Sequence, residues 1–194
     1  MYTTAAKNNM LGALGVTHAS LHTAYSATGA NEVTGGSPAY ARKSITLAAA
    51  SGGSRAASTQ PVFDVPAGTY RWFGFWDAVS GGNFLGMVPI GGDEKEYTTD
   101  TATEKIRCPA HGYVADQKIV FYNGTVPGGL TAGTVYFVRA PGTDDFEVAA
   151  TAGGAAINLT AVNTLDSVVS TIIEDVFAAQ GTETLGSAIF NLNF

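Results

Sequence analysis

Turn signals at short intervals are the feature that most constrains how this chain can fold. Pairs of glycines stand at 35–36, 52–53, 81–82 and 153–154, and segments of alternating apolar and polar residues lie between such turns. Strands broken by turns every 8 to 12 residues or so are typical of β-sandwiches and barrels. Glycine accounts for 24 of 194 residues, roughly double its average share. The sequence therefore predicts an all-β chain whose main domain is a jelly-roll-like β-sandwich.

One short helix is expected at the N-terminus. Thr3 or Thr4 can cap it, because a threonine hydroxyl accepts a hydrogen bond from a backbone N–H of the first turn. Met10 and Leu14 are apolar positions at helical spacing, and Gly15 is expected to end the helix. Strands are predicted in the next eighty residues at 16–23, 40–50, 62–65, 70–76 and 84–90.

The strand at 70–76 carries the most functional promise. Tyr70, Trp72 and Trp76 are expected on one face, and Phe73 and Phe75 on the other. A strand that is apolar on both faces is either central with cover on each side, or meets a partner with one face. Trp and Tyr offer a large contact area with little entropy to lose. These two tryptophans and Tyr70 are therefore the candidate contacts with a partner or a glycan; the alternative is plain sandwich core.

A second module is predicted in the following part of the chain. Residues 93–105 are polar and rich in threonine, and we interpret them as a linker. Strands are then expected at 118–122, 134–139, 146–150 and 156–159, separated by Gly- and Pro-containing turns. Its own aromatic residues and turns are what a small independent core requires. The tail at 177–194 returns to strand-like alternation.

Charge and cysteine content exclude several classes of partner and site. The chain has 10 Lys and Arg against 16 Asp and Glu, a net charge of −6, which argues against binding nucleic acid. A single cysteine, Cys108, excludes an intrachain disulfide and a multi-cysteine zinc site. No apolar run approaches the 18 or so residues that a membrane-spanning helix needs, so no membrane span is predicted.

No motif for catalysis, metal binding or cofactor binding is present. The chain has no G-x-S-x-G elbow, no P-loop and no G-x-G-x-x-G. His18 and His22 are four residues apart, which on a strand separates them by about 13 Å. Cys108 and His111 are close only in sequence, and 93–96 is interpreted as a solvated charge run. The sequence predicts no catalytic residue, no metal and no cofactor, and hence no enzyme.

Two stretches resemble known phage proteins. In the first, residues 8–86, the segments SLHT, TGANEVTGGSPAYAR and GFWDAVSGGNFLG resemble a family of small structural proteins of tailed bacteriophages, labelled minor tail or tail fibre-like. In the second, residues 111–160, the segments HGYVADQKIVF, PGGLTAGTVYFVRAPGTDDFEVAAT and GGAAINLT are similar to a β-module that recurs in phage virion proteins.

The resemblance implies a domain organisation. In the first family, the strand ending in FLG runs soon into a segment like the one at 179–182, so the module is expected to be an insertion. The expected domains are a virion-docking sandwich of residues 1–97 plus 172–194 and an inserted β-module of residues 98–171. An insertion in an exposed loop costs little, because closure entropy grows only logarithmically with loop length.

The resemblance also implies a function, partners and a location. The chain is expected to be a non-enzymatic part of a bacteriophage virion, made in the host bacterial cytoplasm, and a minor tail or tail-tip protein rather than a capsid protein. Its inserted module is expected to project and contact the host. The expected partners are other virion proteins, further copies of this chain in a homo-oligomer, and a bacterial surface glycan or protein receptor. Two alternatives stay open: a capsid decoration protein, and a carbohydrate-binding module or cell-wall hydrolase of the tail.

Overall fold

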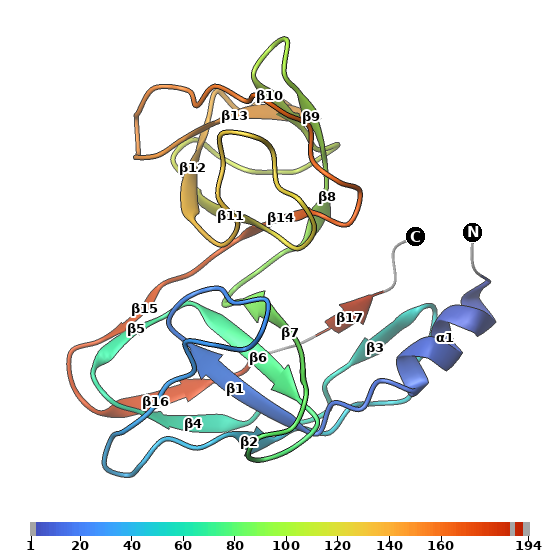
Figure 1. Ribbon diagram of the computed structural model, residues 1–194, viewed down its shortest axis with the longest axis vertical. Coiled ribbons are helices and arrows are strands. Elements are labelled where there is room, and N and C mark those ends of the chain that lie inside the picture. The colour runs from blue at the N-terminus through green and yellow to red at the C-terminus, as the bar shows by residue number, and fades with distance from the viewer. Residues whose placement is uncertain (1–2, 187–188, 192–194) are drawn as a thin grey trace. The chain divides into compact units, whose positions relative to one another are not determined.

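The chain forms two compact units (Figure 1). The computed structural model describes residues 3–186 and 189–191. The first unit comprises Met1–Thr23, Thr28–Val88 and Asp175–Phe194, and the second comprises Ala24–Ala27 and Pro89–Glu174. The division predicted above, with its boundaries after residues 97 and 171, stays a prediction. Among the described residues, no helix is long and apolar enough to cross a membrane.

The predicted N-terminal helix is confirmed as α1 (Thr4–Gly12). The Thr3 hydroxyl oxygen accepts a hydrogen bond from the N–H of Ala6 at 3.2 Å, which satisfies one of the free donors of the first turn. At the other end, Arg55 Nη1 donates to the carbonyl oxygen of Leu11 at 2.8 Å. The helix stops at Gly12, one turn earlier than predicted.

A four-stranded antiparallel sheet forms one layer of the first unit. Its order is β2-β1-β6-β7, and its strands are β2 (Lys43–Ser44), β1 (His18–His22), β6 (Trp72–Trp76) and β7 (Phe84–Pro89). In the β1–β6 ladder Leu21 lies opposite Phe73. All five residues of β6 are buried, and β6 lies between β1 and β7, which agrees with the first of the two alternatives left open above, a central strand with cover on both faces.

The second layer is a two-stranded ribbon. Residues 175–177, 181–184 and 189–191 pair antiparallel with residues 68–70, 62–65 and 54–56, which gives three short strand pairs. The pairs are β3 (Ser54–Ala56) with β17 (Ile189–Asn191), β4 (Val62–Val65) with β16 (Gly181–Thr184), and β5 (Gly68–Tyr70) with β15 (Asp175–Phe177). The buried Phe63 ring of β4 lies 6.0 Å from the Phe73 ring of β6. The ribbon thus packs on the sheet and completes a β-sandwich.

The second unit is one seven-stranded antiparallel sheet around a single core. Its order is β8-β14-β11-β12-β13-β10-β9. The strands are β8 (Lys95–Glu96), β9 (Thr98–Asp100), β10 (Lys105–Arg107), β11 (Lys118–Tyr122), β12 (Val135–Arg139), β13 (Asp145–Ala149) and β14 (Val168–Thr171). Ile106 of β10 and Val169 of β14 belong to the same buried cluster as Phe121 and Phe146. The sheet therefore curls so that strands near both of its ends face one core.

The prediction of an all-β chain is confirmed, but several local predictions are wrong. Residues 93–105, expected to be a linker, supply β8, β9 and the start of β10, because β14 pairs with β8, β13 pairs with β10, and β9 pairs with β10. Residues 40–50 form a ladder only at Lys43–Ser44, with one further bridge from Leu47 to Ala57. Residues 156–159 make a single bridge, from Ala156 to Ala149.

Candidate functional site

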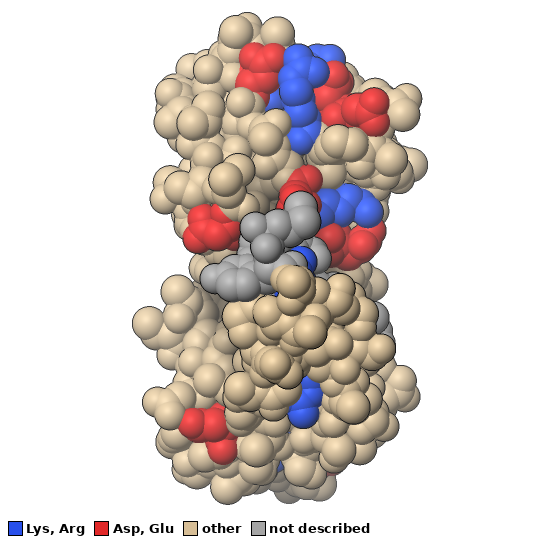
Figure 2. All heavy atoms as spheres, turned by 90° about the vertical axis from the view of Figure 1, so that its right-hand side faces the viewer, with Lys and Arg blue, Asp and Glu red and all other residues tan. Residues whose placement is uncertain are grey.

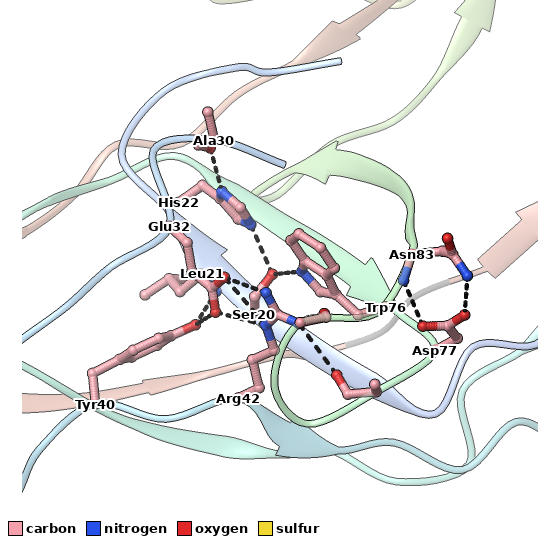
Figure 3. A network of polar contacts seen from close by, with 12 residues as sticks. Ser20, Leu21, His22, Ala30, Glu32, Tyr40, Arg42, Trp76, Asp77 and Asn83 are labelled. Atoms are coloured by element: carbon pink, nitrogen blue, oxygen red, sulfur yellow. Dashed lines mark hydrogen bonds and ion pairs between the residues drawn. The ribbon is translucent and has the colours of Figure 1, made fainter. Parts of the chain in front are cut away.

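The segments that carry the family resemblance meet in the first unit (Figure 3). We call Ser20, His22, Glu32, Tyr40, Arg42 and Trp76 the signature network. The antiparallel register of β1 and β6 places Ser20 opposite Gly74, so Ser20, His22 and Trp76 share one face of the sheet. The loop after β1 returns Glu32, Tyr40 and Arg42 to the same place. Residues up to 56 positions apart in the sequence are joined by hydrogen bonds.

At the centre of the network lies a buried serine–histidine pair. The Ser20 hydroxyl is 2.7 Å from His22 Nε2, and His22 Nδ1 is 2.8 Å from the carbonyl oxygen of Ala30. A carbonyl oxygen only accepts, so Nδ1 carries the proton and Nε2 accepts from the hydroxyl of Ser20. The indole N–H of Trp76 donates to the same hydroxyl oxygen at 2.8 Å. Each of these polar atoms therefore has a partner when His22 is neutral.

This pair has the spacing of a nucleophile and its base but not the setting. Ser20 and His22 are both 0 % exposed, so a substrate has no route to the hydroxyl. The group behind the imidazole is a backbone carbonyl, whereas the usual orienting group is a carboxylate. Burial lowers the pKa of His22, which keeps the ring neutral. The pair serves as an internal tie between β1, the following loop and β6.

Arg42 fixes the loop against the turn after β6. Its Nε and Nη2 donate to both carboxylate oxygens of Glu32, at 2.7 to 3.1 Å. Its Nη1 donates to the carbonyl oxygens of Ala78 at 3.2 Å and Gly81 at 2.8 Å. The guanidinium also stacks over Trp76, 3.5 Å from the ring centroid, a favourable cation–π arrangement. One side chain thus joins a loop, a turn and the aromatic face of β6.

Tyr40 attaches the same loop to both layers of the sandwich. Its hydroxyl oxygen accepts from the N–H of Leu21 at 2.8 Å and donates to Glu32 at 3.4 Å. Its ring stacks on Phe63 with centroids 6.1 Å apart. Burial raises the pKa of Tyr40, so the hydroxyl keeps the proton that it donates to Glu32.

Gly29 and Gly82 are positions of the signature segments at which glycine is required. Gly29 has a φ of +78°, and a Cβ there would lie 2.5 Å from the ring of Trp76. A Cβ on Gly82, with a φ of +73°, would collide with the carboxylate of Asp77. That carboxylate accepts hydrogen bonds from the backbone and side chain of Asn83, and these bonds lower the pKa of Asp77. The glycines of the motif therefore permit close packing around the network.

A shallow hollow of about 340 Å³ lies beside the network. Exposed residues of two loops line it, Thr34 and Gly35 on one side and Val79 and Ser80 on the other. Arg42 forms part of its wall, but the guanidinium is already paired with Glu32. The hollow is a feature of the surface on which the loops meet.

The structure separates the three aromatic residues predicted as contacts. Trp72 and Trp76 lie on one face of β6, where they are 0 % and 8 % exposed. The strand expected at 70–76 breaks at Arg71, so Tyr70 belongs to β5; it is 1 % exposed and its hydroxyl donates to the carbonyl of Pro66. All three side chains are in the interior of the first unit. Their contact with a partner or glycan stays a prediction.

Sequence reasoning singled out Trp76 and considered His22, but it did not single out Glu32 or Arg42, which hold the loop of the network in place. Glu32 and Arg42 are ten residues apart in a loop, with no periodicity to link them. The only signal was their place in the segments that carry the resemblance. In the part of the chain that the structure describes, no group of three or more His, Cys, Asp or Glu side chains is placed to hold a metal ion.

The fold and the network together define an all-β protein whose signature residues build an internal framework. Residues 5–107, more than half of the chain, match the family described as podophage GP4 fiber I protein gp80. The chain belongs to this family, and is therefore a structural, tail-related phage protein whose partners include other virion proteins. No curated protein and no solved structure matches the chain.

Proposed function

We propose that this chain is a non-enzymatic minor tail or tail-tip protein that docks into the virion through its first unit. The second unit, which we propose is the inserted module, projects outward and contacts the host surface. The observation that carries this proposal is the unequal distribution of charge between the two units.

The first unit is formally neutral, and the second carries the whole net charge of −6. The first has five basic and five acidic residues: Lys7, Arg42, Lys43, Arg55, Arg71, Glu32, Asp64, Asp77, Asp175 and Glu183. The second has five basic and eleven acidic residues. Figure 2 shows one face, on which charged side chains are dense over the second unit and sparse over the first. Burying a charged surface in an interface is costly unless each charge is paired, so the first unit is the better docking surface.

Several charges of the first unit are already paired within it. Arg42 is bound to Glu32 (2.7 Å), and Lys43 lies 3.1 Å from Asp64. Arg55 donates to the carbonyl oxygens of Leu11, at the end of α1, and of Leu14, just beyond it. Docking would therefore leave few charges without partners. This supports an assembled role, since the fully buried centres of interfaces are depleted in charged residues.

The second unit offers an apolar contact on an acidic surface. In the loop before β14, Leu165 is 90 % exposed and Val162 is 62 % exposed. Eleven carboxylates would repel an anionic polymer, so the proposed receptor is a neutral glycan or a protein with a neutral or basic surface. Each contact would be weak, and many copies on one particle would supply the avidity.

Cysteine labelling of intact particles tests which unit faces outward. The native thiol of Cys108 should react little with the dye, because it is 1 % exposed and burial raises its pKa. Phage would carry Leu165→Cys in the second unit, or Val62→Cys or Val79→Cys at exposed positions of the first. All three variants should react with a maleimide dye in the free chain.

In the intact particle, we expect Leu165→Cys to react fully and at least one of the two first-unit positions to be protected. Dye at Leu165→Cys should also reduce adsorption to the host. Full labelling of both first-unit positions together with protection of Leu165→Cys would contradict the proposal. If dye on neither unit reduces adsorption, the proposed host contact is wrong, and the proposed docking through the first unit still stands.

A further inference from the structure

Strand β16 is an edge strand of the first unit. Among the described residues it pairs only with β4. The N–H of Leu185 donates to the carbonyl oxygen of Pro61 at 3.1 Å, just beyond the end of that ladder. In an antiparallel pair, residues that exchange hydrogen bonds alternate with residues that do not. Gly181 and Glu183 therefore bond to β4, whereas Thr182 and Thr184 direct their backbone N–H and C=O groups away from it.

The outward groups of this edge are open. Both Thr182 and Thr184 are exposed. The N–H of Thr184 is taken by the carboxylate of Glu183 at 3.1 Å, while the N–H of Thr182 has no partner among the residues that the structure describes. Proteins usually protect edge strands with lysine or proline, and β16 contains neither. Thr182 thus presents an unpaired donor and acceptor in strand geometry.

We propose that β16 pairs antiparallel with β16 of a second copy of this chain, with the two-fold axis at Thr182. In this register the two Thr182 residues exchange both backbone hydrogen bonds, and Glu183 lies opposite Gly181 of the second copy. The neighbouring register would place Thr182 opposite Thr184 and Glu183 opposite Glu183. That register is disfavoured because two like charges would lie directly opposite each other. The carboxylate of Glu183 is already destabilised by burial and by the nearby Asp175, which raise its pKa.

The chemistry of the edge fits a copy of itself. The contact is isologous, so it closes at two chains and needs no other surface. The first unit is formally neutral, so the two surfaces that meet at this edge carry no net like charge that would oppose the contact. A strand of four residues buries little area, and the pairing is therefore weak in solution. This pairing specifies the contact in the homo-oligomer that the proposed function expects. Its place in the virion rests on that proposed function.

Disulfide trapping of the full-length chain tests the register directly. Residues that exchange hydrogen bonds have Cα atoms about 5.5 Å apart, within the range that a disulfide spans. Thr182→Cys should form a covalent dimer under mild oxidation. Thr184→Cys is the matched control, because the two copies of residue 184 would be offset by four residues, about 13 Å along the strand. We expect Thr182→Cys to cross-link at least about tenfold faster.

A proline substitution tests the backbone pairing without new chemistry. The N–H of Thr182 does not bond to β4, so Thr182→Pro removes the outward donor and leaves the inner ladder in place. Sedimentation equilibrium should show a concentration-dependent dimer for the native chain and for Thr182→Ala, and a dimer at least about tenfold weaker for Thr182→Pro. If the proline variant does not fold, the two cysteine variants decide the question.

Three outcomes would overturn the inference. These are a strictly monomeric native chain, equal cross-linking of the two cysteine variants, and cross-linking of Thr182→Cys to a different virion protein in the particle. A chain that is monomeric in solution but occupies the phage tail would refute this pairing alone and leave the proposed function standing.

Discussion

At the scale of single residues, the most instructive feature is a serine–histidine pair that stabilises rather than reacts. The side chains of Ser20 and His22 hydrogen-bond to each other. The remaining ring nitrogen of His22 bonds to the carbonyl oxygen of Ala30, and the Ser20 hydroxyl oxygen also accepts from the indole of Trp76. Because a buried polar group without a partner costs about 1–3 kcal/mol, such a closed arrangement specifies one packing of the sheet. The same two residue types in an open cleft would suggest hydrolysis, so burial decides between the two interpretations.

Gly74 is the residue that makes room for this pair. A Cβ at that position would lie 2.5 Å from Ser20 Oγ and closer still to His22 Nε2. We predict that Gly74→Ala lowers the free energy of unfolding by about 1–3 kcal/mol, as overpacking of a core does. Chemical denaturation followed by tryptophan fluorescence measures this, because both tryptophans lie in the first unit.

Gly12 provides the control, since a Cβ there meets nothing within 4 Å. Gly12→Ala should stabilise the helix by up to about 1 kcal/mol. Equal effects of the two substitutions would show that the space around Ser20 and His22 is not tight.

His22 also predicts a pH dependence. Burial lowers its pKa below the ordinary value of 6.5, so the unfolded chain binds the proton more readily than the folded chain. The stability from a neutral His22 is fully present above pH 6.5 and is lost as the pH falls from there toward the lowered pKa. The unfolding free energy of the first unit, followed by tryptophan fluorescence, should decrease over this window. The same slope in His22→Gln would assign the effect to another group.

At the scale of elements, one arginine holds a loop and a turn to a strand. Arg42 and Glu32 are mostly buried, with 10 % and 21 % of their side chains exposed. Lysine keeps the charge but cannot reproduce the forked hydrogen bonds or the stacking on Trp76. We predict that Arg42→Lys lowers the unfolding free energy by about 2–4 kcal/mol, measured by denaturation.

The matched control is Lys43→Ala, which breaks a half-exposed ion pair with Asp64 in the same unit. Pairs of this kind contribute about 1 kcal/mol or less. A loss of stability from Arg42→Lys no larger than the loss from Lys43→Ala would show that Arg42 does not hold the loop and the turn in place.

The elements that could be predicted from the sequence are those with strong apolar patterns. Residues 118–122 were predicted with their observed bounds, and 16–23 contain β1. Strand β16, with the sequence Gly-Thr-Glu-Thr, lies in the tail predicted as strand-like alternation, but its own residues have no apolar alternation, and its bounds depend on pairing with β4. Likewise, β8 and β10 depend on partners more than 30 residues away. Local patterns do not contain such pairings.

The candidate site was predictable only as a set of motif segments. The resemblance named the stretches that contain Ser20, Glu32, Arg42 and Trp76. Their convergence depends on the β1–β6 register, which places Ser20 opposite Gly74. It also depends on a loop that turns back over the sheet, and neither can be read from spacing. Tyr70 was predicted on the same strand as Trp76, but the strand breaks at Arg71, so Tyr70 pairs with β15 instead.

At the scale of the whole molecule, a family match and a charge distribution support the same role. The chain belongs to a phage fibre family, and its neutral first unit is the surface that assembly would bury at least cost. The acidic second unit would be left to face the medium, where charge favours solubility. The proposal thus assigns opposite surface properties to two tasks, docking and host contact.

The most direct test of this account is cryo-electron microscopy of the intact phage, with this chain located in the density. We expect a symmetric cluster of copies on the tail, with the first unit against neighbouring virion proteins and the second unit directed outward. Copies spread over the capsid lattice, or a particle that lacks the chain altogether, would contradict it.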